Sequence, residues 1–446
     1  MGIVSAFCAV LLLSVGVYLT LKSGFFQFLR WRLIFRVTFK KLFKSRNLAG
    51  FKAMSIALGS TIGIGNIIGV AAAVIIGGPG AVFWMLMTGF AGMMIKFAEV
   101  YICVDEAKTA KRAFGGPMYV FKNRCSGIYK KFGNVFAAVT VLASFFAGNL
   151  MQSRSVYRFA KIGFDIGFWP VTLLIIPLLF VILIGKDRMY QNFSAAFVPL
   201  MSLFYIFSVL IIIFVNIENV PGAVLSVFQS AFGLKQAAGG FSGAVLSSAL
   251  RTGVMKGLFT HEAGMGSSPI AHASTKDADP FCQGCWGIIE VFIDTVVVCM
   301  LTAVAVLSSP IYLNSNISDP FTLITEIFNS VFGTFGIKAL SLSSCCFAFA
   351  SIIGWSFYGL KALEFFSQKP VHKKIYVVIF LLTVPLSVLF DEGIIWILTD
   401  IFNSAMLIPN CCLLMCFGGE SVETLAKIKK VLEIERPRAY NIPQRR

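Results

Sequence analysis

The chain has 446 residues, of which 57% are hydrophobic and only 13% are charged. A soluble domain typically carries about 25% charged residues, so this composition excludes a soluble protein and indicates a protein whose solvent is largely lipid. The net charge of +17 does not point to nucleic acid, because the basic residues lie in short clusters between apolar runs, as in the cytoplasmic loops of membrane proteins.

Apolar runs long enough to cross a bilayer, which takes about 20 residues each, follow one another along the chain. They lie near 3–22, 51–77, 80–104, 132–151, 167–185, 192–215, 243–273, 284–308, 335–364, 374–390 and 393–417. The first run lacks the basic start of a signal peptide and is long enough to span, so we expect a retained helix. The sequence therefore predicts an all-α polytopic membrane protein with about eleven transmembrane helices.

Lysine and arginine are concentrated after the odd-numbered runs, whereas the connection 309–334 after the eighth run has neither. Positive charge favours the cytoplasmic side, so we predict a cell-membrane protein with its N-terminus outside and its C-terminus in the cytoplasm. Arg154, Arg158 and Lys161, after the fourth run, go against this trend. Residues 25–43 mix aromatic and basic side chains and are predicted to form an interfacial helix on the cytoplasmic face.

Two runs are interrupted by small and polar residues. The second contains "GSTIGIGNIIG" (59–69) and the seventh contains "GLFTHEAGMGSSPIAHAS" (257–274). Irregular backbone at membrane depth is tolerated only beside protein or a watery cavity, although small residues also serve close helix packing. Packing alone would explain Gly59, Gly63 and Gly77. The seventh run adds Glu262 and Pro269 to its glycines, which favours a broken helix.

The interrupted runs are five spans apart. If the first helix is set aside, the others form two units of five, and the second unit enters from the opposite face because five is odd. We expect an inverted repeat, whose interrupted helices mark a transporter's site near the midplane of the membrane. The predicted parts are an N-terminal region (1–50), a first repeat (51–215), an external connection (216–242), a second repeat (243–417) and a basic cytoplasmic tail (418–446).

Six motifs occur in order between about residues 50 and 365: "STIGIGNIIGVA", "GGPGAVFWM", "GGPMYV", "GLFTHEAGMGSSPIAHA", "EVFIDT" and "IIGWSFYG". They resemble the alanine/glycine:cation symporter family, which has the leucine-transporter fold. The resemblance implies Na⁺-coupled symport of a small neutral amino acid, alanine or glycine, into the cell by alternating access. It implies Na⁺ as the coupling ion, no covalent cofactor and no obligate protein partner.

The resemblance also implies substrate-binding residues: Gly65, Asn66, Gln152, Phe259, Gly264 and Trp355. The Asn66 amide can donate to a carboxylate and accept from an ammonium, or it can satisfy neighbouring backbone groups. Gln152, at the end of the fourth run, corresponds to the family's glutamine. Phe259 and Trp355 are the expected apolar walls, which would limit the size of the substrate.

The candidate sodium ligands are Gly59, Gly63 and Ser351, because unwound carbonyls and a hydroxyl offer hard oxygens to the cation. Ser351 lies four residues before Trp355, on the same helix face, and the family usually has threonine there. Its hydroxyl is expected either to complete the sodium site or to touch the substrate carboxylate. The residues leave both roles open.

Ionisable residues inside the runs are functional hypotheses by default. Glu262 is expected to pair with Lys256 or Arg251, to cap a half-helix or to carry a proton, and we favour pairing or capping. Glu290 and Asp294 are expected to be structural anchors, and Lys96 with Glu99 (i, i+3) a local ion pair.

The family usually has Ser-Asn where this chain has Thr260-His261. A histidine at this place leaves proton coupling open as an alternative.

The sequence disfavours two other classes of function. A channel is disfavoured because no repeated pore segment or filter ring is present. An enzyme is disfavoured because the three histidines show no metal-ligand spacing such as H-E-x-x-H. The "CQGC" pair at Cys282 and Cys285 stands alone, which favours packing over a metal or redox role.

Overall fold

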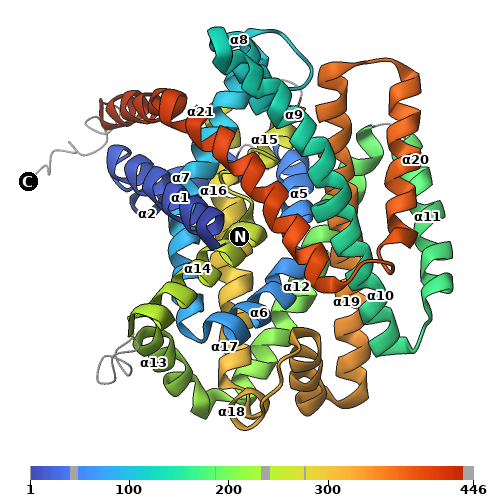
Figure 1. Cartoon of the computed structure of the whole chain (residues 1–446). Helices are drawn as coiled ribbons and strands as arrows, with labels where there is room; N and C mark the ends of the chain where they lie inside the picture. The colour runs from blue at the N-terminus through green and yellow to red at the C-terminus, as the bar shows by residue number, and fades with distance from the viewer. Residues whose placement is uncertain (1, 41–48, 186, 233–241, 276–277, 435–446) are drawn as a thin grey trace, which may run out of the picture.

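The computed structural model describes residues 2–40, 49–185, 187–232, 242–275 and 278–434. Throughout these ranges the regular secondary structure is helical, with no β-strand, as the composition predicts. Figure 1 shows the helices packed into one bundle, with α8 at one end and α13 and α18 at the other. Long helices with buried apolar faces form its interior.

The N-terminal region consists of α1 (Gly2–Lys22), the short helices α2 (Phe26–Leu29) and α3 (Trp31–Phe35), and the π-helical segment η1 (Arg36–Lys40). The predicted interfacial helix 25–43 is therefore three short pieces as far as residue 40, and residues 41–43 lie outside the described ranges. Phe25 takes a left-handed conformation with φ of 57°, which separates α1 from α2.

The region that corresponds to the first predicted repeat contains eleven elements. They are α5 (Ala49–Thr61), η2 (Ile64–Asn66), α6 (Ile68–Gly77), α7 (Gly80–Thr109), α8 (Pro117–Arg124), η3 (Gly127–Lys131), α9 (Phe132–Ala143), the π-helical η4 (Ser144–Leu150), α10 (Met151–Phe164), α11 (Phe168–Ile184) and α12 (Asp187–Val215).

The rest of the chain follows a similar order, with a break near its start. Its elements are η5 (Ile217–Asn219), α13 (Val220–Ala231), α14 (Ser242–His261), α15 (Ser268–His272), α16 (Pro280–Val291), the π-helical η7 (Phe292–Cys299), α17 (Met300–Ser308), α18 (Pro310–Asn314), α19 (Pro320–Phe366), α20 (Pro370–Leu386) and α21 (Glu392–Ile434). The rest of the predicted connection (233–241) and the end of the basic tail (435–446) lie outside the described residues.

Six helical stretches in the described part of the chain are long and apolar enough to cross a membrane. They are Gly80–Thr109, Gly127–Phe164, Phe197–Val215, Pro280–Ser308, Pro320–Phe366 and Glu392–Ala426. Three shorter apolar helices accompany them: Ala6–Lys22, Ile68–Gly77 and Phe168–Ile184. The two interrupted runs are divided into shorter helices at their breaks. The number of eleven spans therefore stays a prediction.

Two predicted boundaries are wrong. The fourth run does not end at residue 151, because helix continues through α10 to Phe164, and Gln152 lies inside this continuous helix. The hydropathy pattern stops early since α10 buries polar residues, among them Gln152, Ser153 and Ser155. The connection 309–334 is largely helical, because it holds α18 and the first arm of α19, which bends at Gly333 with φ of 61°.

Arg158, one of the basic residues that go against the charge trend, has two acidic partners. Its guanidinium donates to Glu392 at 2.6 Å and to Asp319 at 2.9 Å. Lys161 pairs with Asp165 at 2.5 Å. Both positive charges are therefore paired locally, and the orientation of the chain stays a prediction.

Candidate functional site

The first break, residues 62–67, separates α5 from α6 and is held by its own asparagine. The backbone N–H of Gly63 donates to Asn66 Oδ1 at 3.0 Å. Asn66 Nδ2 donates in turn to Asp294 Oδ1 at 2.8 Å, on η7. Both side chains are fully buried. The unwound segment is thus fixed by side-chain bonds that replace part of the missing helical ladder.

The second break, residues 262–267, separates α14 from α15. Gly264 and Gly266 have φ of 88° and 74°, a conformation that glycine adopts without a steric penalty. Their N–H groups donate to Glu99 Oε2 at 3.1 and 3.2 Å. Asn410 Nδ2 donates to the same oxygen at 2.8 Å and to the Gly264 carbonyl at 2.9 Å. A carboxylate from α7 therefore accepts the N–H groups that the break leaves free.

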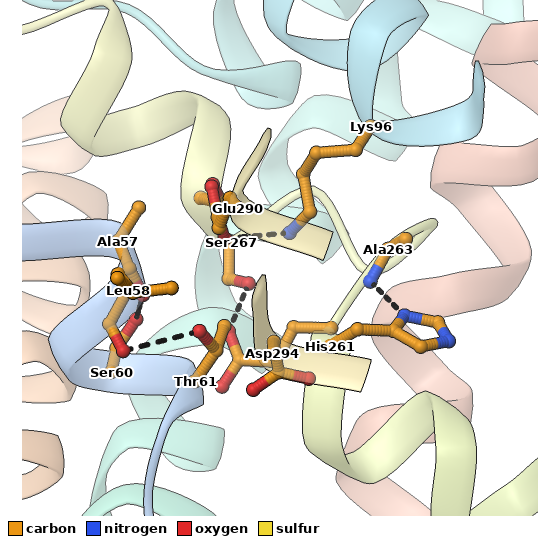
Figure 2. Close-up of polar contacts among 12 residues, drawn as sticks. Ala57, Leu58, Ser60, Thr61, Lys96, His261, Ala263, Ser267, Glu290 and Asp294 are labelled. Atoms are coloured by element: carbon orange, nitrogen blue, oxygen red, sulfur yellow. Dashed lines mark hydrogen bonds and ion pairs between the residues drawn. The ribbon is translucent and has the colours of Figure 1, made fainter. Parts of the chain in front are cut away.

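A buried charge cluster lies behind the second break. Lys96 Nζ lies 3.3 Å from Glu290 Oε1 and 3.7 Å from Glu99 Oε1, and all three side chains are fully buried. The Ser268 hydroxyl donates to Glu290 Oε2 at 2.9 Å. Figure 2 shows Lys96 directed at Glu290 across this region. Buried charges are tolerated when they are paired and hydrogen-bonded, so this cluster ties α7, α15 and α16 together.

Glu262 has a left-handed φ of 52° and accepts a hydrogen bond of 2.6 Å from the Ser267 hydroxyl, at the start of α15. Lys256, one of its expected partners, instead places Nζ 3.5 Å from the centre of the Trp396 ring. The neighbouring His261 accepts at Nδ1 from the Ala263 N–H at 2.9 Å (Figure 2).

A small cavity lies between the two breaks. It is lined by Ser60, Thr61, Gly63, Gly65, Ala147, Gln152, Phe259, Glu262, Trp355 and Asn403. In this conformation it has room for about one water molecule at most. Six predicted site residues meet here from four separate parts of the fold: Gly63, Gly65, Gln152, Phe259, Glu262 and Trp355.

Two sodium candidates lie directly beside this cavity. The Ser351 hydroxyl donates to the Gly59 carbonyl at 3.3 Å. A Cβ placed on Gly63 would lie 2.5 Å from Ser351 Oγ and 3.6 Å from Gln152 Oε1. Glycine at residue 63 therefore lets the Ser351 hydroxyl on α19 lie directly against the first break. The structure brings Gly59, Gly63 and Ser351 together.

The other predicted residues do not line the cavity. Asn66 and Asp294 are bonded to one another, and Gly264 is held by Glu99 and Asn410. They lie in or against the two breaks, whose shape their hydrogen bonds determine.

Four lining residues were not among the sequence predictions: Ser60, Thr61, Ala147 and Asn403. Ser60 and Thr61 lie within a quoted motif, and their hydroxyls donate to the carbonyls of Ala57 and Leu58 (Figure 2). Ala147 carries no sequence signal, although it lies in the π-helical η4, and such segments are frequent at functional sites. Asn403 could have been found from the sequence, since it is an amide side chain inside an apolar run.

The fold and this cavity define a helical membrane transporter of the leucine-transporter fold. The solved structure of MhsT in complex with L-phenylalanine matches with a TM-score of 0.62 over 85% of this chain and 92% of that one, at 16% identity. At this identity the likeness shows the fold alone.

Sequence comparisons give the family. The model of the sodium:alanine symporter family matches residues 2–439. The sodium/alanine symporter AgcS of Methanococcus maripaludis is 31% identical, with 97% of this chain and 95% of that protein covered. An uncharacterized transporter of Haemophilus influenzae is 33% identical over 90% and 88%. The probable sodium/glutamine symporter GlnT of Bacillus subtilis is 30% identical over 90% and 83%. This chain belongs to the sodium:alanine symporter family, and it is a transporter of amino acids, not an enzyme.

Proposed function

We propose that the protein couples the entry of Na⁺ to the uptake of a small neutral amino acid, alanine or glycine, across the cell membrane. The observation that carries this proposal is the cavity between the two breaks, where unwound backbone, amide side chains and two aromatic walls meet at membrane depth. Alternating access follows from the fold, in which one repeat moves against the other around such a site.

The aromatic side chains at the cavity limit the size of the substrate. A Cβ placed on Gly65 would lie 3.0 Å from the Phe259 ring, so this ring packs directly on the first break. Trp355 closes another side of the cavity. We assign the substrate's methyl group or hydrogen to the space between these walls, and its charged ends to the backbone of the first break and to Gln152.

We assign the sodium ion to the place where Ser351 meets the first break. Ser351 Oγ and the Gly59 carbonyl oxygen are hard ligands already 3.3 Å apart. Gly59 lies in the last turn of α5, and Gly63 follows in the unwound stretch. Of the two roles open for Ser351, this arrangement supports the ion, since its hydroxyl faces a carbonyl oxygen that a carboxylate would repel.

We propose a supporting role for four other residues. Asn66, Gly264 and Asp294 maintain the shape of the two breaks through their hydrogen bonds. Glu262, at the cavity wall, is held by its hydrogen bond to Ser267. Proton coupling through His261 receives less support, because a ring nitrogen that accepts from a backbone N–H carries no proton. We further propose that the N-terminus lies outside the cell and the C-terminus inside, as the distribution of basic residues indicates.

Purified protein in proteoliposomes tests the proposal. An inward Na⁺ gradient should drive the accumulation of labelled alanine or glycine, and replacement of Na⁺ by K⁺ or choline should abolish it. Uptake that ignores Na⁺ but follows a pH gradient would establish the proton-coupled alternative. Substrate flux without saturable counterflow would establish a channel.

A further inference from the structure

Asn403 is a lining residue that neither the motifs nor the expected site residues include. It lies on α21 and is only 3% exposed, and its amide faces the cavity. Its Oδ1 has no hydrogen-bond partner among the described residues. A buried amide oxygen without a donor costs free energy, so such an atom at a cavity wall calls for a ligand that donates to it.

Gln152 presents a second acceptor of the same kind. It is 4% exposed, lines the same cavity from α10, and its Oε1 also lacks a partner within the described part of the chain. The hydroxyls of Ser60 and Thr61 already donate to backbone carbonyls, and Glu262 Oε2 already accepts from Ser267. The cavity therefore presents two amide oxygens in need of donors.

We infer that Asn403 Oδ1, together with Gln152 Oε1, accepts hydrogen bonds from the ammonium group of the transported amino acid. An ammonium carries three N–H donors and no acceptor, and hydrogen bonds to a charged group are the stronger kind. Because both residues line the same small cavity, we assign both oxygens to a single compact group. The substrate carboxylate needs donors instead, which unwound backbone near the start of α6 can supply.

The helix that carries Asn403 is well fixed for this role. Asn410, seven residues further along α21, lies on the same face two turns away. Its side chain bonds to Glu99 and to the Gly264 carbonyl. One face of α21 thus joins the second break to the cavity, and this places the Asn403 amide against the site.

The inference rests on the proposed function and adds a chemical requirement to it: the site selects primary ammonium groups over substituted ones. Alanine offers three N–H groups, whereas protonated N,N-dimethylalanine offers one. The two ligands differ at the nitrogen and share their carboxylate and side chain. A residue that binds the ammonium should therefore contribute more to the affinity for alanine than to the affinity for its dimethylated analogue.

Competition against labelled alanine, in Na⁺-loaded assays with the full-length protein, measures this difference. Asn403→Leu and Asn403→Ala should raise the concentration of alanine that gives half-inhibition about tenfold or more. They should raise the half-inhibiting concentration of N,N-dimethylalanine much less. Asn403→Asp keeps acceptor oxygens at this place and should retain the preference for alanine. Asn329→Ala, the same residue type on the first arm of α19 and outside the cavity lining, is the matched control and should change neither value.

Thermal unfolding of each purified variant identifies any that do not fold. If Asn403→Leu and Asn403→Ala do not fold, Asn403→Asp still tests whether an acceptor oxygen at residue 403 maintains the preference for alanine. Equal losses for both ligands in the folded Asn403 variants, or unchanged alanine competition, would overturn the role of Asn403 while leaving symport intact. A wild-type protein that takes up no alanine or glycine under any ion gradient would overturn both proposals.

Discussion

The side-chain amide of Asn66 donates to the carboxylate of Asp294 at 2.8 Å, across 228 residues of sequence. This bond joins the first break to the π-helical segment η7. The same amide accepts the Gly63 N–H through its oxygen, and Thr295 donates to the other oxygen of Asp294 at 2.9 Å. The first break is therefore braced by a fully buried chain of hydrogen bonds.

This brace predicts a graded loss of stability at residue 294. Asp294→Ala should destabilise the protein by about 1–3 kcal/mol, since the buried amide of Asn66 loses its shortest, charged acceptor. It keeps only the backbone carbonyl of residue 294 at 3.2 Å and the Cys299 sulfur at 3.3 Å. Asp294→Asn should cost less, because its oxygen can still accept from Asn66. Thermal unfolding in detergent checks the order, and identical midpoints for the two variants would contradict it.

Removal of the Ser351 hydroxyl tests the proposed sodium site. Ser351→Ala should raise the Na⁺ concentration for half-maximal uptake about tenfold, the effect of a lost ligand worth about 1.4 kcal/mol. Ser351→Thr keeps the hydroxyl and should stay close to wild type. If Ser351→Ala instead changes the affinity for the substrate and leaves the Na⁺ response intact, Ser351 contacts the substrate's carboxylate.

The close approach of α19 at residue 63 gives a paired experiment. Gly63→Ala should abolish uptake, because its Cβ would lie 2.5 Å from Ser351 Oγ. Adding Ser351→Gly should restore the folded protein by removing the clash, but not the Na⁺ response. Unfolding midpoints and Na⁺ titrations separate the two effects. Normal uptake by the single variant would show that the helices do not approach so closely.

Lys96 is expected to be indispensable for stability. It is fully buried between Glu99 and Glu290, and removing one member of a buried ion pair typically costs about 3–5 kcal/mol. Lys96→Met should therefore lower the unfolding midpoint strongly. Lys96→Met with Glu290→Gln should recover part of the loss. Lys22→Met, at an exposed lysine on α1, serves as the control, and equal effects of the two lysine substitutions would contradict the assignment.

Phe259 is expected to limit substrate size. Phe259→Ala removes the ring that packs on Gly65, so larger neutral amino acids such as valine or leucine should begin to compete with alanine, while alanine itself binds more weakly. A panel of competing amino acids measures the shift. An unchanged order of preference would place the size limit elsewhere.

Asp319, which directly precedes the apolar stretch Pro320–Phe366, is expected to make the stability of the fold depend on pH. Partial burial raises the pKa of Asp319, but hydrogen bonds from Thr322 and the nearby Arg158 guanidinium outweigh it, so its pKa lies below the ordinary value. A carboxyl with a lowered pKa stabilises the fold fully above its unfolded pKa, about 3.9. That contribution is lost as the pH falls through the folded pKa.

Acid unfolding checks this sign. The unfolding midpoint of wild type should fall more steeply below about pH 4 than that of Arg158→Gln, which already lacks part of this stabilisation at neutral pH and so has less to lose. Lys161→Gln, whose pair with Asp165 is largely exposed, is the comparison. Parallel pH profiles for wild type and Arg158→Gln would contradict the role of the pair.

The sequence by itself determined the class of protein, the all-helical fold, the places of both breaks and the family. These features depend on local properties, since hydropathy over about 20 residues marks a span and clustered glycines mark where a span unwinds. "GSTIGIGNIIG" and "GLFTHEAGMGSSPIAHAS" could therefore be interpreted without any knowledge of their neighbours.

Only the tertiary structure decided which polar groups face the cavity and which bond to one another. Asn66 and Asn403 are both amides in apolar runs, yet one braces a break and the other faces the cavity. Glu99 pairs with Lys96 as the spacing predicts, but it also accepts N–H groups from a break 165 residues away. Such partners depend on how distant helices pack, because a buried polar group must be satisfied by whatever the fold places beside it.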